Sequence, residues 1–187
     1  MTQPTAITDH ASAATASPWV VRFAPLIAPG GAVLDVAAGG GRHADFMFRL
    51  GHPVAAVDRD TAALAQMPGV TVVQADLEDG GAWPLGARKF AGIIVTNYLH
   101  RPLFPLLLGS LLPGGVLIYE TFALGNEAFG RPRTPDFLLR PGELLTAFAA
   151  LTVVAYEHGR VDTPRPAVMQ RLCARAAPAT RTAAGGV

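Results

Sequence analysis

The segment from Val33 to His43 reads VLDVAAGGGRH and holds the residues best suited to binding a small ligand. An apolar run that carries Asp35 leads into three glycines, residues 39–41, and a helix-compatible stretch follows from Arg42 to Leu50. Glycine tolerates positive φ and lets a ligand approach the backbone closely. The unpaired N–H groups at a helix start favour the anionic end of a ligand. The segment therefore predicts a strand, a tight turn and a helix that together hold a small molecule.

Two further aspartates follow the next two apolar segments of the chain. Asp58 comes directly after Pro53–Val57, and Asp76 comes shortly after Val70–Gln74. A carboxylate at the first position can accept both hydroxyls of a ribose. Asp76 can accept a hydrogen bond from an exocyclic amine while Leu77 packs against a base. Each acid alone is typical of a turn or a helix cap, but acids at three successive strands indicate a ligand that contains adenosine.

Two cofactors compete for the glycine turn. The spacing Gly39-x-Gly41-x-x-Ala44 fits the dinucleotide pattern G-x-G-x-x-G/A and favours an NAD(P)-dependent oxidoreductase. Asp35 favours another ligand, because a carboxylate inside the strand can meet a cationic amine, directly or through water. Alternatively, Asp35 has a structural role only, as a buried acid that is hydrogen-bonded to the backbone. S-adenosylmethionine has an ammonium, a carboxylate and adenosine, so it would use both the acid and the helix start. The sequence contains no evident Tyr-x-x-x-Lys pair, which would have supported an oxidoreductase.

These motifs resemble those of the class I S-adenosylmethionine-dependent methyltransferases. DVAAGGGRH resembles the first motif of the family, D-x-x-x-G-x-G, with Ala38 in place of a frequent Cys or Gly. Asp58 and Asp76 match the family's acids after the second and third strands, and Pro113-Gly114-Gly115 matches its turn before the fifth. The resemblance covers residues 32–117 and continues more weakly to residue 175. Residues 97–104 and 119–122 also resemble small bacterial methyltransferases of the tellurite-resistance type.

The resemblance implies an α/β, Rossmann-like, doubly wound and mostly parallel seven-stranded sheet with an antiparallel last strand and helices on both faces. It implies a methyltransferase of EC class 2.1.1 with S-adenosylmethionine as cofactor, acting on a small-molecule acceptor by in-line transfer. A protein that binds this cofactor without turnover is a third possibility. The implied cofactor-binding residues are Asp35, Ala37, Gly39, Gly41, Asp58, Arg59, Asp76, Leu77 and Asn97.

Apolar periodicity predicts the elements that position these residues. Ser17 and Pro18 indicate a helix start, and the predicted tails, residues 1–17 and 176–187, are disordered and flank a single domain, residues 18–175. The predicted strands cover residues 32–37, 53–57, 70–74, 90–96, 116–121, 151–158 and 167–174. Further helices are predicted for residues 42–50, 61–66, much of 101–112 and 141–149.

Composition narrows the functional classes. The 187 residues include 16% charged residues and carry a formal net charge of +1 without a long basic block, so no nucleic-acid partner is expected. The single Cys173 cannot form an intramolecular disulfide and fits a reducing compartment, and the histidines lack a metal-binding spacing. The N-terminus does not read as a signal peptide, and the apolar segment 103–118 is too interrupted to span a membrane. We therefore expect a cytoplasmic protein without a metal; its oligomeric state stays open.

The sequence assigns no catalytic residue, because positioning an already activated methyl donor can supply much of the catalysis. Candidates for a base or a substrate contact are Tyr98, His100, Glu120 and His158, and Arg42 can meet the cofactor carboxylate, although each also has an ordinary structural interpretation. The motif NYLH at residues 97–100 is not Asn/Asp-Pro-Pro-Tyr/Phe, which disfavours nucleobase and glutamine acceptors.

The segment from Phe122 to Arg140 is long for a connection in a compact domain and is predicted to cover the acceptor. Its arginines, Arg131, Arg133 and Arg140, would favour an anionic small molecule. The alternative is a structural cap packed by Phe129, Phe137 and Leu138.

Overall fold

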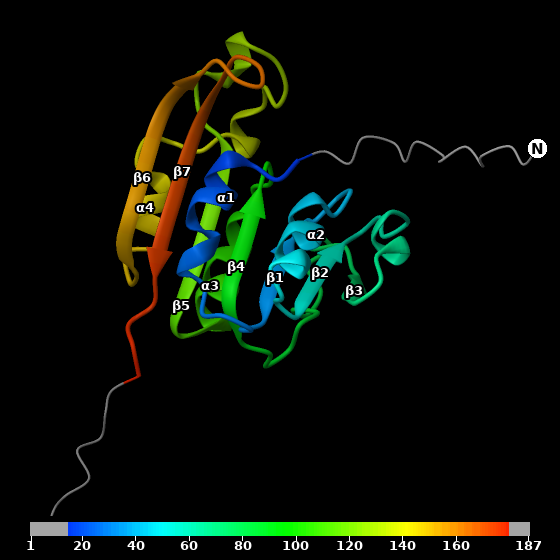
Figure 1. The fold of residues 1–187 in the computed structure, drawn as a ribbon. Coiled ribbons are helices and arrows are strands. Elements are labelled where there is room, and N and C mark those ends of the chain that lie inside the picture. Colours follow the sequence, from blue (N-terminus) through cyan, green and yellow to red (C-terminus); the bar gives the residue numbers. More distant parts are fainter. Residues whose placement is uncertain (1–14, 180–187) are drawn as a thin grey trace, which may run out of the picture.

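The computed structural model describes residues 15–179, and a seven-stranded sheet forms its centre. The strand order is β3-β2-β1-β4-β5-β7-β6 (Figure 1). Neighbours among the first five strands pair in parallel, and β7 pairs antiparallel with both β5 and β6. The strands are β1 (Val33–Val36), β2 (Val54–Asp58), β3 (Val70–Gln74), β4 (Phe90–Thr96), β5 (Leu111–Phe122), β6 (Thr152–Val161) and β7 (Ala167–Arg175).

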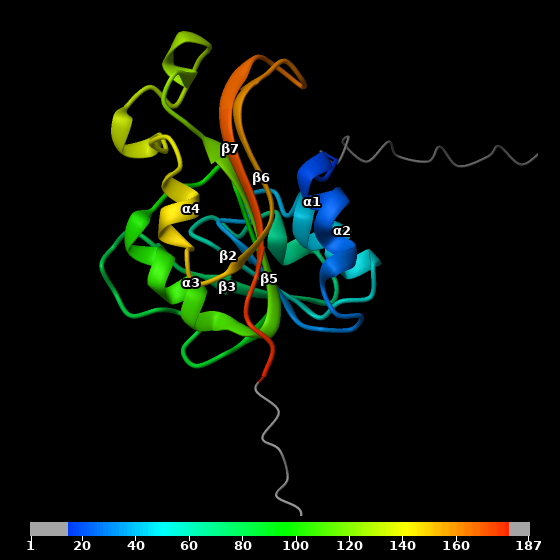
Figure 2. The same cartoon turned by 90° about the vertical axis from the view of Figure 1, so that its left-hand side faces the viewer.

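Helices cover both faces of this sheet. Figure 2 shows α1 (Pro18–Phe23) and α2 (Arg42–Arg49) on one face, and α3 (Phe104–Ser110) and α4 (Glu143–Ala147) on the other. The predicted fold class is confirmed, including the antiparallel last strand. Short 3₁₀ turns complete the chain: η1 (Ala24–Leu26), η2 (Leu64–Gln66), η3 (Arg101–Leu103), η4 (Asn126–Ala128) and η5 (Pro135–Phe137).

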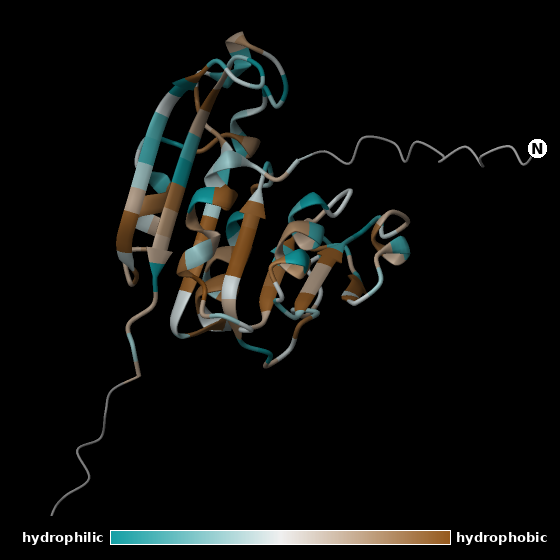
Figure 3. Ribbon diagram, in the orientation of Figure 1, coloured by the Kyte–Doolittle hydropathy of each residue, from teal (hydrophilic) through white to brown (hydrophobic). Residues whose placement is uncertain are grey.

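Alternating side chains along the strands form two hydrophobic cores, one under each helical layer. Leu34 and Val36 of β1 join the core that contains Leu107 of α3 and Phe148, which follows α4. Val33 joins the opposite core with Met47 of α2. Figure 3 shows the hydrophobic residues concentrated along β1 and β4. Because both faces of the central strands are buried, β1 and β4 are apolar apart from Asp35 and the terminal Thr96.

Local sequence explains most element boundaries. The Ser17 hydroxyl caps α1 by accepting a hydrogen bond from the Trp19 N–H at 3.1 Å, as expected. Pro25 coincides with a change from α-helix to the 3₁₀ turn η1, as the sequence predicts.

Several boundaries differ from the prediction, and two of these differences have a clear physical reason. The segment predicted as a helix over residues 61–66 forms only the 3₁₀ turn η2, because Pro68 and Gly69 follow too soon for a longer helix. The Pro113-Gly114-Gly115 turn lies inside β5, because Leu111 already pairs with Phe90 of β4.

The chain ends fall largely outside the described residues, so the predicted disorder of residues 1–14 and 180–187 stays a prediction. At the described end of the second predicted tail, the Ala176 N–H donates to the Gly115 carbonyl at 2.8 Å. The Gly114 N–H donates to the Ala177 carbonyl at 3.0 Å. In the described part of the chain, no helix combines the length and apolarity needed to cross a membrane.

The strand order changes direction between β1 and β4. Strands β2 and β3 lie on one side of β1, and the strands from β4 onward lie on the other side. In open α/β sheets, ligands bind beyond the carboxyl ends of the strands at such a switch point. The glycine turn, Asp58, Asp76 and Asn97 all follow strands at this edge. The fold therefore gathers the sequence-predicted residues at one place.

Candidate functional site

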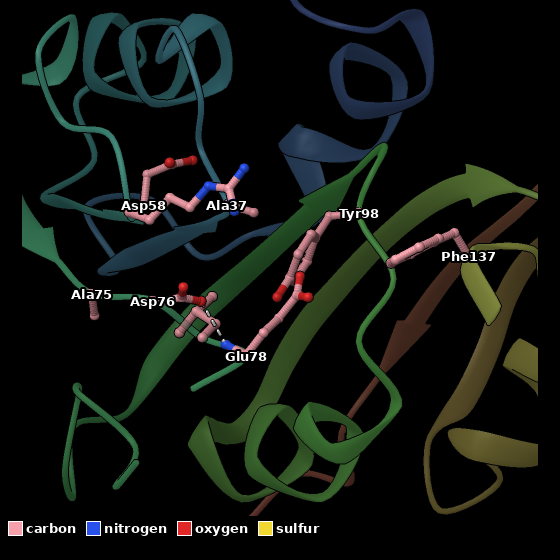
Figure 4. Close-up of a pocket in the computed structure, with 9 residues that line it drawn as sticks. Ala37, Asp58, Ala75, Asp76, Glu78, Tyr98 and Phe137 are labelled. Carbon is pink, nitrogen blue, oxygen red and sulfur yellow. Dashed lines mark hydrogen bonds between the residues drawn. The ribbon is translucent and has the colours of Figure 1, made fainter. Parts of the chain in front are cut away.

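A cavity of about 420 Å³ lies at the switch point of the sheet (Figure 4). Its wall includes five of the residues predicted to bind a cofactor, together with the candidate Tyr98. Residues from the ends of β1, β2, β3 and β4 thus share one cavity, and η5 adds an aromatic ring. The lining residues are Ala37, Asp58, Arg59, Ala75, Asp76, Leu77, Glu78, Tyr98 and Phe137.

The two strands that flank the switch point both end in a left-handed residue. Ala37 after β1 has φ 52°, and Asn97 after β4 has φ 53°, a conformation that residues other than glycine adopt rarely. Among the described residues other than glycine, they alone have positive φ. Such backbone outliers gather at functional sites because the surrounding structure holds them there. The Asn97 N–H is held by the Glu120 carbonyl at 2.9 Å.

Asp58 joins the glycine turn to the end of β2. One carboxylate oxygen accepts from the Gly39 N–H at 2.7 Å, and the other accepts from the Asp60 N–H at 2.9 Å. Each carboxylate oxygen can accept a second hydrogen bond, so Asp58 retains acceptor capacity toward the cavity it lines. On the next strand, the Asp76 carboxylate accepts from the Glu78 N–H at 2.9 Å.

Asp35 lies beneath the site rather than in the cavity wall. Its side chain is buried, and one oxygen accepts from the Ala44 N–H in the first turn of α2 at 3.0 Å. Burial raises the pKa of this carboxyl to about 7, although the Ala44 hydrogen bond and the Arg42 guanidinium oppose the shift. This placement matches the structural interpretation of the acid. A contact with a cationic amine in the cavity would have to be indirect.

His43 connects three elements behind the glycine turn. Its Nε2 accepts from the Ser17 N–H at 3.2 Å, and its Nδ1 lies 3.3 Å from the Thr96 hydroxyl. A neutral ring that accepts at Nε2 carries its proton at Nδ1 and can donate it to that hydroxyl. Burial, with the Arg42 charge, lowers the pKa of His43 to about 4. The imidazole is therefore neutral and fastens the start of α1 to α2 and β4.

Tyr98 is the only one of the four base or substrate candidates that lines the cavity. Its phenol faces the Glu78 carboxylate (Figure 4), and burial together with the Glu78 charge raises the pKa of Tyr98. Glu120 is buried and pairs with Arg171 at 3.2 Å. His158 lines a separate hollow of about 140 Å³ beside β6 and β7. His100 is not among the lining residues.

The segment 122–140 reaches the cavity through one residue. It lies at the same end of the sheet as the carboxyl end of β4 (Figure 1), and Phe137 lines the cavity. Its three arginines do not line the cavity, so the structure does not support the predicted anionic acceptor. Arg140 instead has a structural role through its backbone. Its N–H donates to Glu143 at 2.7 Å, and its carbonyl accepts from Gln170 at 2.6 Å.

This segment closes on itself at its base and is clamped from outside. The Leu139 N–H donates to the Phe122 carbonyl and the Leu124 N–H donates to the Leu139 carbonyl, both at 3.0 Å. Arg101 of η3 donates to the carbonyls on both sides of Phe137, those of Asp136 at 2.6 Å and Leu138 at 3.0 Å. The same guanidinium pairs with Glu143 through two hydrogen bonds, at 2.5 and 3.0 Å.

Solved structures resemble this chain closely in fold, whereas no family model and no curated protein matches its sequence. TehB from Haemophilus influenzae superposes with a TM-score of 0.70 and 17% identity, over 84% of this chain and 61% of that one. The chain thus spans about 61% of the length of TehB.

Two solved methyltransferases also superpose on this chain. The 1,6-didemethyltoxoflavin-N1-methyltransferase of Burkholderia thailandensis, solved with its substrate and S-adenosylhomocysteine, has a TM-score of 0.61 and 22% identity over 85% of this chain and 76% of that one. The N-methyltransferase NodS of Bradyrhizobium japonicum has a TM-score of 0.62 and 14% identity over 84% and 93%.

The chain therefore shares the fold of these solved methyltransferases. Within this fold, the cavity brings together Ala37, Asp58, Arg59, Asp76 and Leu77 of the predicted cofactor set. Gly39 contacts the cavity acid Asp58, and Gly41 begins α2. Asp35 and Asn97 are not among the lining residues.

The sequence analysis missed three residues that line the cavity. Ala75 and Glu78 flank the predicted pair Asp76 and Leu77, so their nearness in sequence was an available signal. Phe137 was considered only as structural packing, and no local pattern distinguishes it from Phe129 in the same segment. Its position depends on contacts with Arg101, which lies 36 residues earlier.

Gly41 and Gly40 offer a matched test of the glycine turn. Gly41 has φ +75°, and a Cβ there would lie 2.4 Å from Met67 Cε and 2.8 Å from Leu64 Cδ2, whereas a Cβ at Gly40 meets nothing within 4 Å. Gly41→Ala should lower the free energy of unfolding by about 1–2 kcal/mol, and Gly40→Ala should change it by less than about 0.5 kcal/mol. Urea denaturation measures both, and equal effects would contradict the assigned geometry.

The titrations of Asp35 and His43 should change the free energy of unfolding in opposite directions as the pH rises. The folded state raises the pKa of Asp35 from 3.8 to about 7, so its contribution is present below pH 3.8 and is lost as the pH rises toward 7. The folded state lowers the pKa of His43 from 6.5 to about 4, so its contribution is present above pH 6.5 and is lost as the pH falls toward 4.

Substituting either residue should reveal how the other one changes the free energy of unfolding with pH. Relative to wild type, the unfolding free energy of Asp35→Asn should rise with pH between 4 and 6.5, by at most about 1.4 kcal/mol per pH unit. His43→Gln should show the opposite relative slope. The measurement is urea unfolding at several pH values in this range. Profiles parallel to wild type in both variants would show that these groups do not titrate as described.

Proposed function

We propose that the protein is an S-adenosylmethionine-dependent methyltransferase that acts on a small-molecule acceptor. The observation that carries this proposal is the cavity at the switch point, with Asp58 and Asp76 following adjacent strands in its wall. The fold of the sheet adds support, and neighbours of the same fold were solved with S-adenosylhomocysteine or sinefungin. The acceptor is unidentified.

The residues of the cavity fit the parts of S-adenosylmethionine. Asp58 would accept the ribose hydroxyls with the lone pairs that Gly39 and Asp60 leave free. Asp76 would accept from the adenine amine, with Leu77 against one face of the base and Arg59 beside it. Ala37 and Asn97 would border the methionine end next to the glycine turn. Bound there, the cofactor supplies an activated methyl group for in-line displacement.

Asp35 and Gly41 would act on this site through the backbone. Asp35 holds the Ala44 N–H of α2, and left-handed Gly41 begins that helix, so together they fix the turn that faces the ligand. The N–H groups of the turn would face the methionine carboxylate. A role for Asp35 toward the ammonium group requires an intervening water or backbone group.

A dinucleotide cofactor is less well supported, despite the Gly39-x-Gly41-x-x-Ala44 spacing. Dinucleotide-binding sheets have the strand order 3-2-1-4-5-6, whereas here β7 lies antiparallel between β5 and β6. The cavity wall carries three carboxylates and one guanidinium, a balance that suits a cationic sulfonium better than a pyrophosphate. The cytoplasmic location stays a prediction from the single cysteine.

Calorimetry with three ligands tests the proposed function. S-adenosylmethionine and S-adenosylhomocysteine should bind at one site, and NAD should produce no binding heat. Release of S-adenosylhomocysteine in an acceptor screen would then separate an enzyme from a protein that only binds the cofactor. Binding of NAD without a response to either adenosyl compound would reject the proposal.

Asp58→Ala tests the assigned ribose contact, with Asp60→Ala as its matched control. Loss of hydrogen bonds to a charged acceptor costs about 1.5–3 kcal/mol, so the affinity for S-adenosylhomocysteine should fall by about 10–100-fold. Asp60 is exposed and does not line the cavity, so its variant should keep the wild-type affinity within about threefold. Circular dichroism checks that both variants are folded. Equal affinities in the two variants would remove Asp58 from the ribose site.

A further inference from the structure

Besides Ala75, three lining residues have no part in the proposed cofactor contacts. Glu78 follows β3, Tyr98 follows β4, and Phe137 belongs to η5. Figure 4 shows the Glu78 carboxylate and the Tyr98 phenol pointing toward each other, with the Phe137 side chain on the far side of Tyr98 from Asp58. They combine one carboxylate with two aromatic rings.

Backbone hydrogen bonds position both Glu78 and Tyr98. The Glu78 N–H donates to the Asp76 carboxylate at 2.9 Å, and the Glu78 carboxylate faces the Tyr98 phenol. The Tyr98 carbonyl accepts from the buried Tyr119 hydroxyl at 2.9 Å. The pair therefore bridges the ends of two strands across the cavity.

The backbone at Phe137 is also held in place, although the residue is 47% exposed. The Arg101 guanidinium binds the carbonyls of the residues before and after it and pairs with Glu143. An exposed phenyl ring on a clamped backbone is a rigid apolar surface with little conformational entropy to lose on binding.

The charges around the cavity favour a cation over an anion. Asp58, Asp76 and Glu78 contribute carboxylates, and Arg59 is the one basic residue in the wall. A carboxylate together with aromatic faces is a recurrent way of recognising ammonium groups. We propose that the methyl acceptor is an amine, recognised by Glu78, Tyr98 and Phe137; this rests on the proposed methyltransferase function.

The bound ammonium first loses one proton to water, and the reaction then balances with the amine as its free base. The nitrogen lone pair forms the new N–C bond as the C–S bond of the donor breaks, and the bonding pair remains on sulfur. The ammonium product then releases one proton to water. Glu78 and the two rings recognise the amine, and the acid Glu78 stabilises the positive charge that develops on nitrogen.

Calorimetric titration of benzylamine and benzoate into protein saturated with S-adenosylhomocysteine tests this acceptor class. The two probes share a phenyl ring and differ in the sign of their charge. Benzylamine should bind at least about tenfold more tightly than benzoate. Glu78→Gln and Phe137→Leu should each weaken benzylamine by about fivefold or more and leave the affinity for S-adenosylhomocysteine within about twofold.

Neighbouring residues outside the cavity supply the controls. Asp79→Asn removes an adjacent exposed carboxylate, and Phe129→Leu removes an exposed phenyl ring in the same segment. Both should retain wild-type affinity for benzylamine.

Several outcomes would overturn the amine assignment while the proposed function stands. These are binding of benzoate as tight as that of benzylamine, no binding of either probe, or variants that weaken S-adenosylhomocysteine instead of the amine. Failure of S-adenosylhomocysteine itself to bind would be a different result, and it would overturn both proposals.

Discussion

The parallel register of β1 with its two neighbours is the constraint on which the site depends. Asp35 pairs with Ala56 of β2 on one side and with Ile94 of β4 on the other. This register brings the residues that follow all three strands to one edge of the sheet. The hydrogen bond from the Gly39 N–H to the Asp58 carboxylate exists because the ends of β1 and β2 are level. The cavity is thus a consequence of strand pairing, and the loops only complete it.

The sequence predicted those features that depend on local patterns. The bounds of β3 and β4 agree with the prediction because each strand is an apolar run between turn residues. The acids after the strands were found for the same reason. In contrast, η2 was predicted as a longer helix, although Pro68 and Gly69, which limit its length, are visible in the sequence. Phe137 and the Arg101 clamp depend on residues far apart in the chain, and no local pattern encodes such contacts.

Asp35 shows how a residue can be identified correctly while its role stays open. The sequence marked it because an acid interrupts an apolar strand, and both a structural and a ligand-binding role were consistent with that. The structure places its carboxylate on the Ala44 N–H, away from water, with a raised pKa. The buried, neutral His43 lies in the same helix turn. Both titratable groups behind the glycine turn therefore support the backbone.

The closed base of the segment 122–140 has a consequence for how the protein can change. Backbone hydrogen bonds among Phe122, Leu124 and Leu139 join the two ends of this segment where it leaves the sheet. Arg101 holds Phe137 independently of the residues between. Because the entropy of closing a loop grows only slowly with its length, insertions among the exposed residues 133–135 cost the sheet little, whereas the buried Asn126, which accepts from the Val168 N–H of β7 at 3.3 Å, must stay. The segment can therefore change in length while the wall of the cavity stays unchanged.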